Sequence, residues 1–132
     1  MVGIVIVAHS RTLAEGVAEV ARAMGVGKAV VEAAGGDPDG GLGTSIVAVE
    51  RAVERAVERA SGDDGVLLLA DIGSSVLTAE MVVEDAREGT VLLADAPLVE
   101  GAIAAASMAA AGADLAAVHA AAEAAWDHRK RS

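Results

Sequence analysis

Short apolar runs alternate along this chain with longer stretches whose apolar residues recur at helical spacing. The runs cover residues 4–7, 29–33, 66–70 and 90–94. The first and third do not alternate between apolar and polar residues, which indicates strands buried on both faces, as in a parallel sheet. The periodic stretches predict helices over residues 13–24, from residue 46, after residue 75 to about residue 87, from residue 97 and after residue 114.

The first helix is expected to begin beside Thr12, because Thr12 and Glu15 fit a capping box, with a hydroxyl and a carboxylate three residues apart. The apolar residues of this helix step by four, three and four, and that spacing predicts one buried stripe. The stripe consists of Leu13, Val17, Val20 and Met24. The helical methionines Met24, Met81 and Met108 are expected to fill the core.

The second helix follows a glycine-rich loop, and the hydroxyls of Thr44 and Ser45 offer N-caps for it. Its predicted buried stripe consists of Ile46, Val49, Val53 and Val57. The opposite face carries Arg51–Glu54 and Arg55–Glu58 at i,i+3 spacing, which is typical of a solvated helix face. Asp114 is expected to cap the last helix, which carries Leu115, Val118 and Trp126.

The order of these elements predicts an α/β fold, a doubly wound parallel four-stranded sheet with helices on both faces, as one domain over residues 1–132. Right-handed crossovers, with strand 2 on one side of strand 1 and strand 3 on the other, give the order 2-1-3-4. The topological switch point then lies between strands 1 and 3. His9 follows one of these strands and Asp71 follows the other, at the edge where open sheets bind ligands.

Composition narrows the possible functions. The formal charge of −10 argues against a nucleic-acid partner, and the basic residues 128–131 are interpreted as a solvated tail. The absence of cysteine excludes disulfides, thiolate catalysis and cysteine-based metal sites. Apolar runs stay short of a membrane span, and the start has no signal-peptide pattern. We therefore expect a cytoplasmic protein that needs no cofactor, metal or membrane.

His9 is the candidate nucleophile. A neutral imidazole attacks through one nitrogen when an acceptor holds the other nitrogen protonated, and Asp71 is placed to be that acceptor. Two structural interpretations stay open: His9 as an ordinary loop histidine, and Asp71 as an N-cap or turn residue. Neither His119 nor His128 belongs to the switch-point loops.

Small polar residues and one arginine surround this pair in the predicted loops. Hydroxyls and backbone N–H groups of this kind can hold the oxygens of a phosphoryl group, so the site favours a phosphohistidine over a metal. The candidate supporting residues are Ser10, Arg11, Thr12, Thr44, Ser45, Gly73, Ser74 and Ser75. Gly73 and Ser74 also fit a simple strand-to-helix turn, and the chain contains no P-loop motif.

Five segments together resemble the phosphotransfer subunits of phosphoenolpyruvate-dependent dihydroxyacetone kinase, the DhaM family. They are residues 5–10, residues 13–17, a two-part signature at residues 33–36 and 43–45 that counts as one segment, residues 65–75 and residues 97–102. The segment 65–75 is similar to the family pattern GVLVLxDLGSA, and residues 97–102 read PLVEGA, as in the family. The departures from the pattern include Ile72, which stands for the usual leucine, and Ser75, which stands for the usual alanine.

The resemblance implies a mannose-type EIIA fold, a homodimer and transient phosphorylation of His9 on Nε2, with Nδ1 facing Asp71. The implied donor is phospho-HPr. The implied acceptor is ADP bound to the DhaL subunit, whose ATP then phosphorylates dihydroxyacetone on DhaK. Some family members carry further domains, and a chain ending at Ser132 is expected to be the single-domain form that depends on a separate HPr.

Other functions share this pattern. The nearest alternative is the EIIA domain of a mannose-family sugar transporter, with a membrane complex as acceptor. A regulatory module with a phosphorylated histidine and a flavodoxin-like metabolite-binding domain are more distant alternatives. Residues 71–75 and 97–102 favour the kinase subunit. The alanine-rich helix from residue 97 and the last helix are both candidate dimer surfaces.

Overall fold

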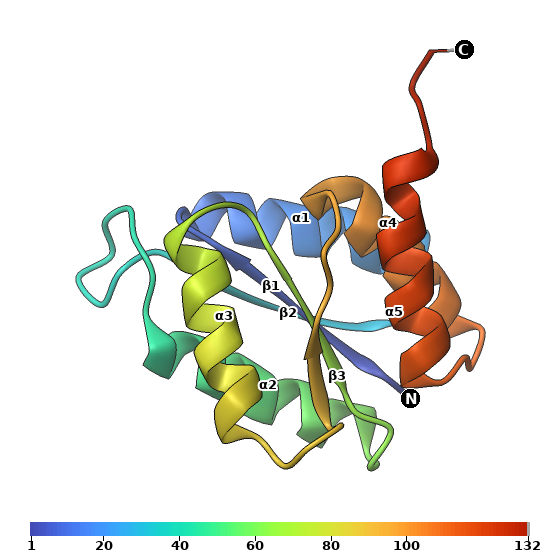
Figure 1. The fold of residues 1–132 in the computed structure, drawn as a ribbon, viewed down its shortest axis with the longest axis horizontal. Coiled ribbons are helices and arrows are strands. Elements are labelled where there is room, and N and C mark those ends of the chain that lie inside the picture. Colours follow the sequence, from blue (N-terminus) through green and yellow to red (C-terminus); the bar gives the residue numbers. More distant parts are fainter. Residues whose placement is uncertain (132) are drawn as a thin grey trace.

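Four parallel strands form the sheet at the centre of the computed structural model, which describes residues 1–131 (Figure 1). Ser132, the last residue of the predicted domain, lies outside the described residues. The elements are β1 (Gly3–Ala8), α1 (Arg11–Met24), β2 (Val30–Gly35), α2 (Ile46–Ala60), β3 (Val66–Ala70), α3 (Ser74–Asp85), β4 (Val91–Leu93), α4 (Leu98–Ala110), α5 (Leu115–Ala124) and a 3₁₀ turn, Ala125–Asp127. The strand order β2-β1-β3-β4 confirms the predicted topology.

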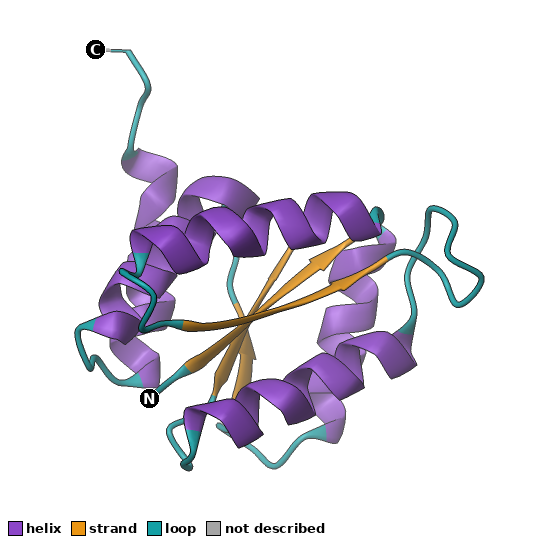
Figure 2. Cartoon of the chain, turned by 180° about the vertical axis from the view of Figure 1, so that it is seen from behind, coloured by secondary structure: helices purple, strands orange, loops and turns teal. Residues whose placement is uncertain are grey.

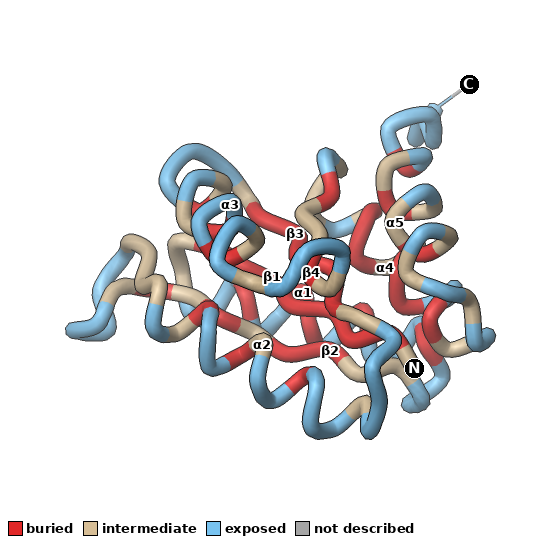
Figure 3. Tube along the Cα trace, turned by 60° about the horizontal axis from the view of Figure 1, so that its bottom comes forward, coloured by how far each residue is buried: buried red, intermediate tan, exposed pale blue. Residues whose placement is uncertain are grey.

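The helices cover both faces of the sheet (Figure 2). Ile4 and Ile6 of β1 pack in one core cluster with residues of α1, α4 and α5. Val5 and Val7 pack in a second cluster with residues of α2 and α3. Every residue of β1 and β3 is buried, as Figure 3 shows for the centre of the molecule. Burial on both faces is the reason that these two strands show no alternation.

Helix α1 differs from its prediction at its start and on its buried face. The N-cap is Ser10, whose side chain accepts a hydrogen bond from the backbone N–H of Leu13, so the capping box at Thr12 was wrong. The buried face consists of Ala14, Val17, Ala18 and Ala21. Three members of the predicted stripe are exposed instead, Leu13 by 43%, Val20 by 44% and Met24 by 53%. Alanine methyl groups fill most of the contact of this helix with the sheet and α4, and the larger side chains remain exposed.

Helix α2 begins after Ser45, whose hydroxyl accepts from the N–H of Ala48, and this confirms the predicted cap. Its fully buried positions are Val49, Ala52 and Ala56, whereas Val57 is exposed, so the predicted stripe is only partly right. Two arginines of α2, Arg55 and Arg59, pair with Glu32. Glu32 is a buried carboxylate of β2, and the two cations compensate the cost of its burial. The predicted i,i+3 pairs on the helix surface missed this connection.

The other observed ends of strands and helices differ from the predicted ones by a few residues. Strand β2 extends to Gly35, β4 has three residues, and α3 ends at Asp85. Met81 and Met108 are exposed and do not fill the core. Asp114 caps α5, as predicted, because its side chain accepts from the N–H of Ala117.

The alanine-rich face of α4 is not a dimer surface, because its alanines are buried within their own chain against α1 and α5. They are Ala102, Ala105, Ala106 and Ala109. Within residues 1–131, no helix has the length and apolar composition that a membrane crossing requires.

Candidate functional site

His9 lies in the two-residue link between β1 and α1, at the carboxyl edge of the sheet. Its side chain is 31% exposed, so part of it is open to solvent. Two contacts fix this loop. Gly43 donates its N–H to the carbonyl of His9 at 2.9 Å. Gly35, at the end of β2, lies so close to the backbone of this loop that a Cβ on residue 35 would be 2.5 Å from the carbonyl oxygen of Ser10.

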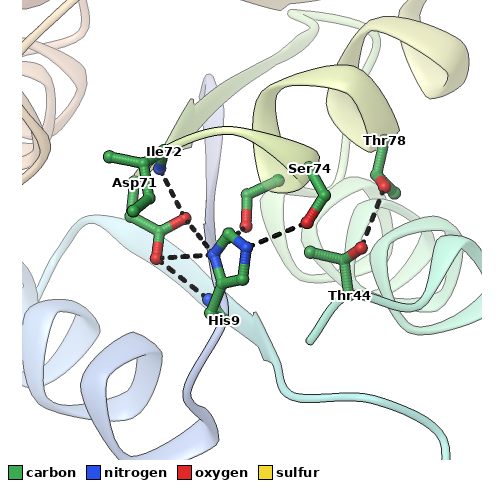
Figure 4. A network of polar contacts seen from close by, with 7 residues as sticks. His9, Thr44, Asp71, Ile72, Ser74 and Thr78 are labelled. Atoms are coloured by element: carbon green, nitrogen blue, oxygen red, sulfur yellow. Dashed lines mark hydrogen bonds and ion pairs between the residues drawn. The ribbon is translucent and has the colours of Figure 1, made fainter. Parts of the chain in front are cut away.

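Asp71 follows β3 directly and reaches His9 across the switch point (Figure 4). Its Oδ2 accepts a hydrogen bond from the backbone N–H of His9 at 3.0 Å, and both of its carboxylate oxygens lie 3.1 Å from Nδ1 of the ring. The backbone N–H of Ile72 donates to Oδ1 at 2.7 Å. The N-cap of α3 is Gly73, so Asp71 does not cap that helix. The carboxylate instead orients the imidazole.

These contacts determine the protonation of the pair. Burial acts to raise the pKa of Asp71, but hydrogen bonds from the backbone N–H of His9, the Ser75 hydroxyl and the backbone N–H of Ile72 outweigh it. The pKa of Asp71 therefore lies below its ordinary value, and the group is a carboxylate at neutral pH. Because a carboxylate only accepts hydrogen bonds, Nδ1 of a neutral His9 carries the proton. Nε2 then holds the free lone pair.

Ser74, the first residue of α3, occupies the Nε2 side of the ring. Its Oγ lies 2.9 Å from Nε2, and its hydroxyl donates to the free lone pair. The preceding Gly73 has a φ of 50° and gives α3 no side-chain cap. The amino end of α3 therefore meets the ring with a hydroxyl that does not cap the helix and with the positive end of the helix dipole, both of which favour an anion there.

Ser75 lies on the other side of the imidazole. Its Oγ is 3.1 Å from Nδ1, and its side chain is fully buried. The structure therefore brings together four of the predicted site residues, His9, Asp71, Ser74 and Ser75. Of the two serines, Ser74 is beside the nitrogen with the free lone pair and Ser75 is beside the protonated one.

The predicted supporting residues on α1 have other contacts. Ser10 caps α1. Arg11 donates from Nε to Glu15 at 3.1 Å, with its side chain 76% exposed. Thr12 is exposed in the first turn of the helix. A role for these three residues in holding a phosphoryl group stays a prediction.

The loop before α2 contributes a bridge that the sequence did not predict. Thr78, one turn into α3, donates from its hydroxyl to that of Thr44 at 3.2 Å, and this bond joins the loop to α3 beside Ser74 (Figure 4). Ser45 is the cap of α2. Thr78 follows Ser74 by four residues on the same helix, and this i,i+4 spacing was the available signal. Among residues 1–131 there is no group of three His, Asp or Glu side chains able to hold a metal ion.

Comparisons with known proteins identify the family of this chain. Residues 3–119 match the family model EIIA-man, described as PTS system fructose IIA component. The chain is 41% identical, over 87% of its length, to the phosphoryl donor subunit DhaM of PEP-dependent dihydroxyacetone kinase from Escherichia coli strain K12. It spans only 25% of that relative. A shorter relative of the same name from Listeria innocua is 36% identical, with 80% of this chain and 84% of the relative covered.

Solved structures give the same fold. A crystal structure of a protein of unknown function superimposes with a TM-score of 0.75 at 30% identity, covering 92% of each chain. A sigma-54 interaction domain protein from Enterococcus faecalis gives 0.72 at 19% identity, which indicates a shared fold alone. On the family model and the relatives together, this chain belongs to the EIIA-man family of PTS IIA components and, within it, to the DhaM-type subunits.

Proposed function

We propose that this chain is a cytoplasmic phosphocarrier, the phosphoryl donor subunit of a phosphoenolpyruvate-dependent dihydroxyacetone kinase. The observation that carries the proposal is the His9 ring, with Nδ1 bound to Asp71 and Nε2 beside the start of α3. This arrangement provides an oriented nucleophile and a site that favours an anion. The name shared by the relatives, phosphoryl donor subunit DhaM, supports the same role.

The proposed transfer starts with the lone pair on Nε2 attacking the phosphorus of phospho-HPr. The new N–P bond forms as the bond from phosphorus to the HPr histidine breaks, and that nitrogen takes the electron pair. The Nδ1 proton stays on the ring, and the Asp71 carboxylate stabilises the positive charge that develops there. Ser74 is then placed to donate its hydroxyl to a phosphoryl oxygen.

The second half of the proposed relay empties the site. An oxygen of the terminal phosphate of ADP, bound on DhaL, attacks the same phosphorus, and ATP forms as the N–P bond breaks and returns its electron pair to Nε2. That ATP phosphorylates dihydroxyacetone on DhaK. At the end of the cycle Nδ1 still carries its proton and Nε2 has regained its lone pair. The carrier therefore needs no external base.

Exposed aliphatic side chains near His9 support docking of a protein donor and a protein acceptor. They stand in the loops and first helical turns at the carboxyl edge of the sheet, and they are Leu13, Leu42, Val47, Ile72 and Leu77. Leu42 is 79% exposed and Ile72 71% exposed. Scattered exposed aliphatics are ordinary on a surface, but a group around a reactive side chain is typical of an interaction site.

The first experiment tests the phosphohistidine. We expect incubation with phosphoenolpyruvate, enzyme I and HPr to add one acid-labile phosphoryl group, detected by intact mass. His9→Ala is expected to abolish the mass gain, and His119→Ala is the matched control, because His119 lies on α5 and pairs with Glu123. A mass gain that persists in His9→Ala contradicts the proposal.

A second experiment identifies the acceptor. The phosphorylated chain is mixed with ADP-loaded DhaL, and we expect loss of the phosphoryl group with formation of ATP. Retention of the group there, with discharge by a mannose-type membrane transporter, would assign the chain to sugar transport. Retention with both acceptors would favour a regulatory module.

We further propose that two copies pair through the open edge of β4, in keeping with the homodimer that the resemblance implies. This three-residue strand ends the sheet, and its outer edge is unpaired within residues 1–131. Beside it is a hollow of about 710 Å³ lined by apolar side chains that include Leu93, Pro97 and Trp126. Light scattering is expected to give a dimer for the wild type and for Leu42→Ala, and a monomer for Trp126→Ala. A dimer that survives Trp126→Ala contradicts this surface.

A further inference from the structure

Ser75 is one of only two buried polar residues among residues 1–131, the other being Glu32. Glu32 has two arginine partners, which account for its burial. Ser75 is the second residue of α3, a position where a serine is ordinarily exposed or helps to cap the helix. Here the N-cap is Gly73, and no side chain caps α3. The Ser75 hydroxyl is therefore free for another role.

The contacts of this hydroxyl define that role. Oγ lies 3.1 Å from Nδ1 of His9, the same nitrogen that both oxygens of the Asp71 carboxylate contact. The hydroxyl also acts to lower the pKa of Asp71. Since Nδ1 already carries a proton, Oγ accepts a share of the Nδ1–H bond. The hydroxyl hydrogen is then left to be directed toward the neighbouring Asp71 carboxylate, whose pKa this hydroxyl acts to lower. The carboxylate receives hydrogen bonds from the backbone N–H groups of His9 and Ile72 and from Nδ1, the nitrogen beside which Ser75 lies.

We propose that Ser75 is a positioning residue for the phosphorylation of His9, acting through Asp71 and Nδ1 rather than by holding the phosphoryl group. This inference rests on the proposed phosphocarrier function. Ser75 lies beside Nδ1, whereas Nε2 is the attacking nitrogen and has Ser74 next to it. A hydroxyl that donates to the carboxylate restricts its rotation and stabilises its charged form. A fixed, charged Asp71 in turn keeps the proton on Nδ1 and the lone pair on Nε2.

The chain offers a well-matched variant for the test. The DhaM pattern usually has alanine where this chain has Ser75, so Ser75→Ala is compatible with the fold and removes only the hydroxyl. Ser107→Ala is the control, because Ser107 is exposed on α4, away from His9. Folding of both variants is checked by thermal melting.

The deciding measurements are made on the unphosphorylated protein. NMR follows the Asp71 carboxyl carbon through a pH titration and reads the His9 tautomer from the ring nitrogen shifts. In Ser75→Ala, we expect the Asp71 midpoint to move to higher pH and the population with the proton on Nδ1 to fall, with no change in Ser107→Ala. The hollow beside Asp71 is also lined by the carboxylates of Glu80, Glu84 and Asp95. These are the same in every variant, so their influence on the Asp71 midpoint cancels in the comparison.

A double-mutant cycle tests the dependence on Asp71. Ser75→Ala is expected to slow phosphorylation about tenfold in the wild-type background, as for the loss of one hydrogen bond to a charged group. In Asp71→Asn it is expected to have no further effect. An unchanged midpoint and tautomer, or equal slowing in both backgrounds, overturns the proposal. Because the NMR measurements need no phosphoryl transfer, they decide the role of Ser75 even if His9 fails as a carrier.

Discussion

The loops that follow β1 and β3 resemble each other in position but use their serines differently. Each loop leaves a fully buried strand at the same edge of the sheet and enters a helix. In the first loop, the Ser10 hydroxyl accepts from the N–H of Leu13 and caps α1. In the second loop, Gly73 occupies the N-cap, and the hydroxyls of Ser74 and Ser75 contact the ring of His9.

This difference separates a residue that stabilises the fold from residues that serve the site. A hydroxyl N-cap contributes about 1 kcal/mol to stability, and α3 forgoes it. The adjacent serines of α3 are directed instead to the two ring nitrogens of one histidine. A helix start whose polar residues satisfy a neighbour rather than their own backbone is thus evidence for a functional site. The four predictions below test this comparison.

Asp71→Asn is expected to have the largest effect, because an amide in this position no longer enforces the proton on Nδ1. We expect phosphorylation of His9 to slow by roughly tenfold to a hundredfold, in line with hydrogen bonds to a charged group. Rapid quench followed by intact mass measures the rate. Asp85→Asn, at the exposed end of α3, is the control. Wild-type kinetics in Asp71→Asn would remove the carboxylate from the mechanism.

Ser74→Ala is expected to have the next largest effect on phosphoryl transfer. It removes the hydroxyl beside Nε2, and we expect transfer to slow by about threefold to tenfold, the range for one neutral hydrogen bond. The unfolding free energy is expected to stay the same, because Ser74 does not cap α3. Urea titration and the transfer assay are run on the same preparations, with Ser107→Ala beside them. A loss of stability without slower transfer would contradict this prediction, because it would show that Ser74 stabilises α3 rather than serving the site.

The sequence was sufficient for the topology of the fold and for the central pair of the site. Non-alternating runs identify β1 and β3 because both faces of these strands are buried. Right-handed crossovers then limit the strand order, and the switch point brings His9 and Asp71 to the same edge. These inferences use the arrangement of whole elements, so they tolerate small errors in the boundaries.

Side-chain assignments within the elements were less predictable. The stripe of α1 was right at Val17 and wrong at its other three positions, because residue size was used to choose the buried face. The close contact of this helix with the sheet and α4 instead selects Ala14, Ala18 and Ala21. Ser10 and Thr12 both fit an N-cap, and only the backbone decides between them. The contact of Glu32 with Arg55 joins elements 23 residues apart, and spacing on one helix does not reveal it.

Ser10→Ala tests the first loop of the comparison. Loss of the cap on α1 is expected to lower the unfolding free energy by about 1 kcal/mol. We expect the transfer rate to be unchanged, since the hydroxyl serves the helix rather than His9. Urea titration gives the stability, and the phosphorylation assay gives the rate. Slower phosphoryl transfer with no change in stability would instead indicate that Ser10 helps to hold the phosphoryl oxygens.

The smallest effect is the pH dependence of stability at the second loop. The pKa of Asp71 is lowered in the folded chain because the hydrogen bonds from His9, Ser75 and Ile72 outweigh its burial. Such a carboxylate stabilises the fold at pH values above its unfolded pKa, and that contribution is lost as the pH falls through the lower folded pKa. The stability difference between wild type and Asp71→Asn is therefore expected to fall in acid, as the pH drops below the ordinary pKa of aspartate and through the lower folded pKa of Asp71. The difference in unfolding free energy between wild type and Ser10→Ala is expected to stay the same at every pH, because serine does not titrate.

Urea titrations of the wild type and the two variants, made at a series of pH values, test this comparison. If the unfolding free energies of the two variants depend on pH in the same way, the prediction is contradicted.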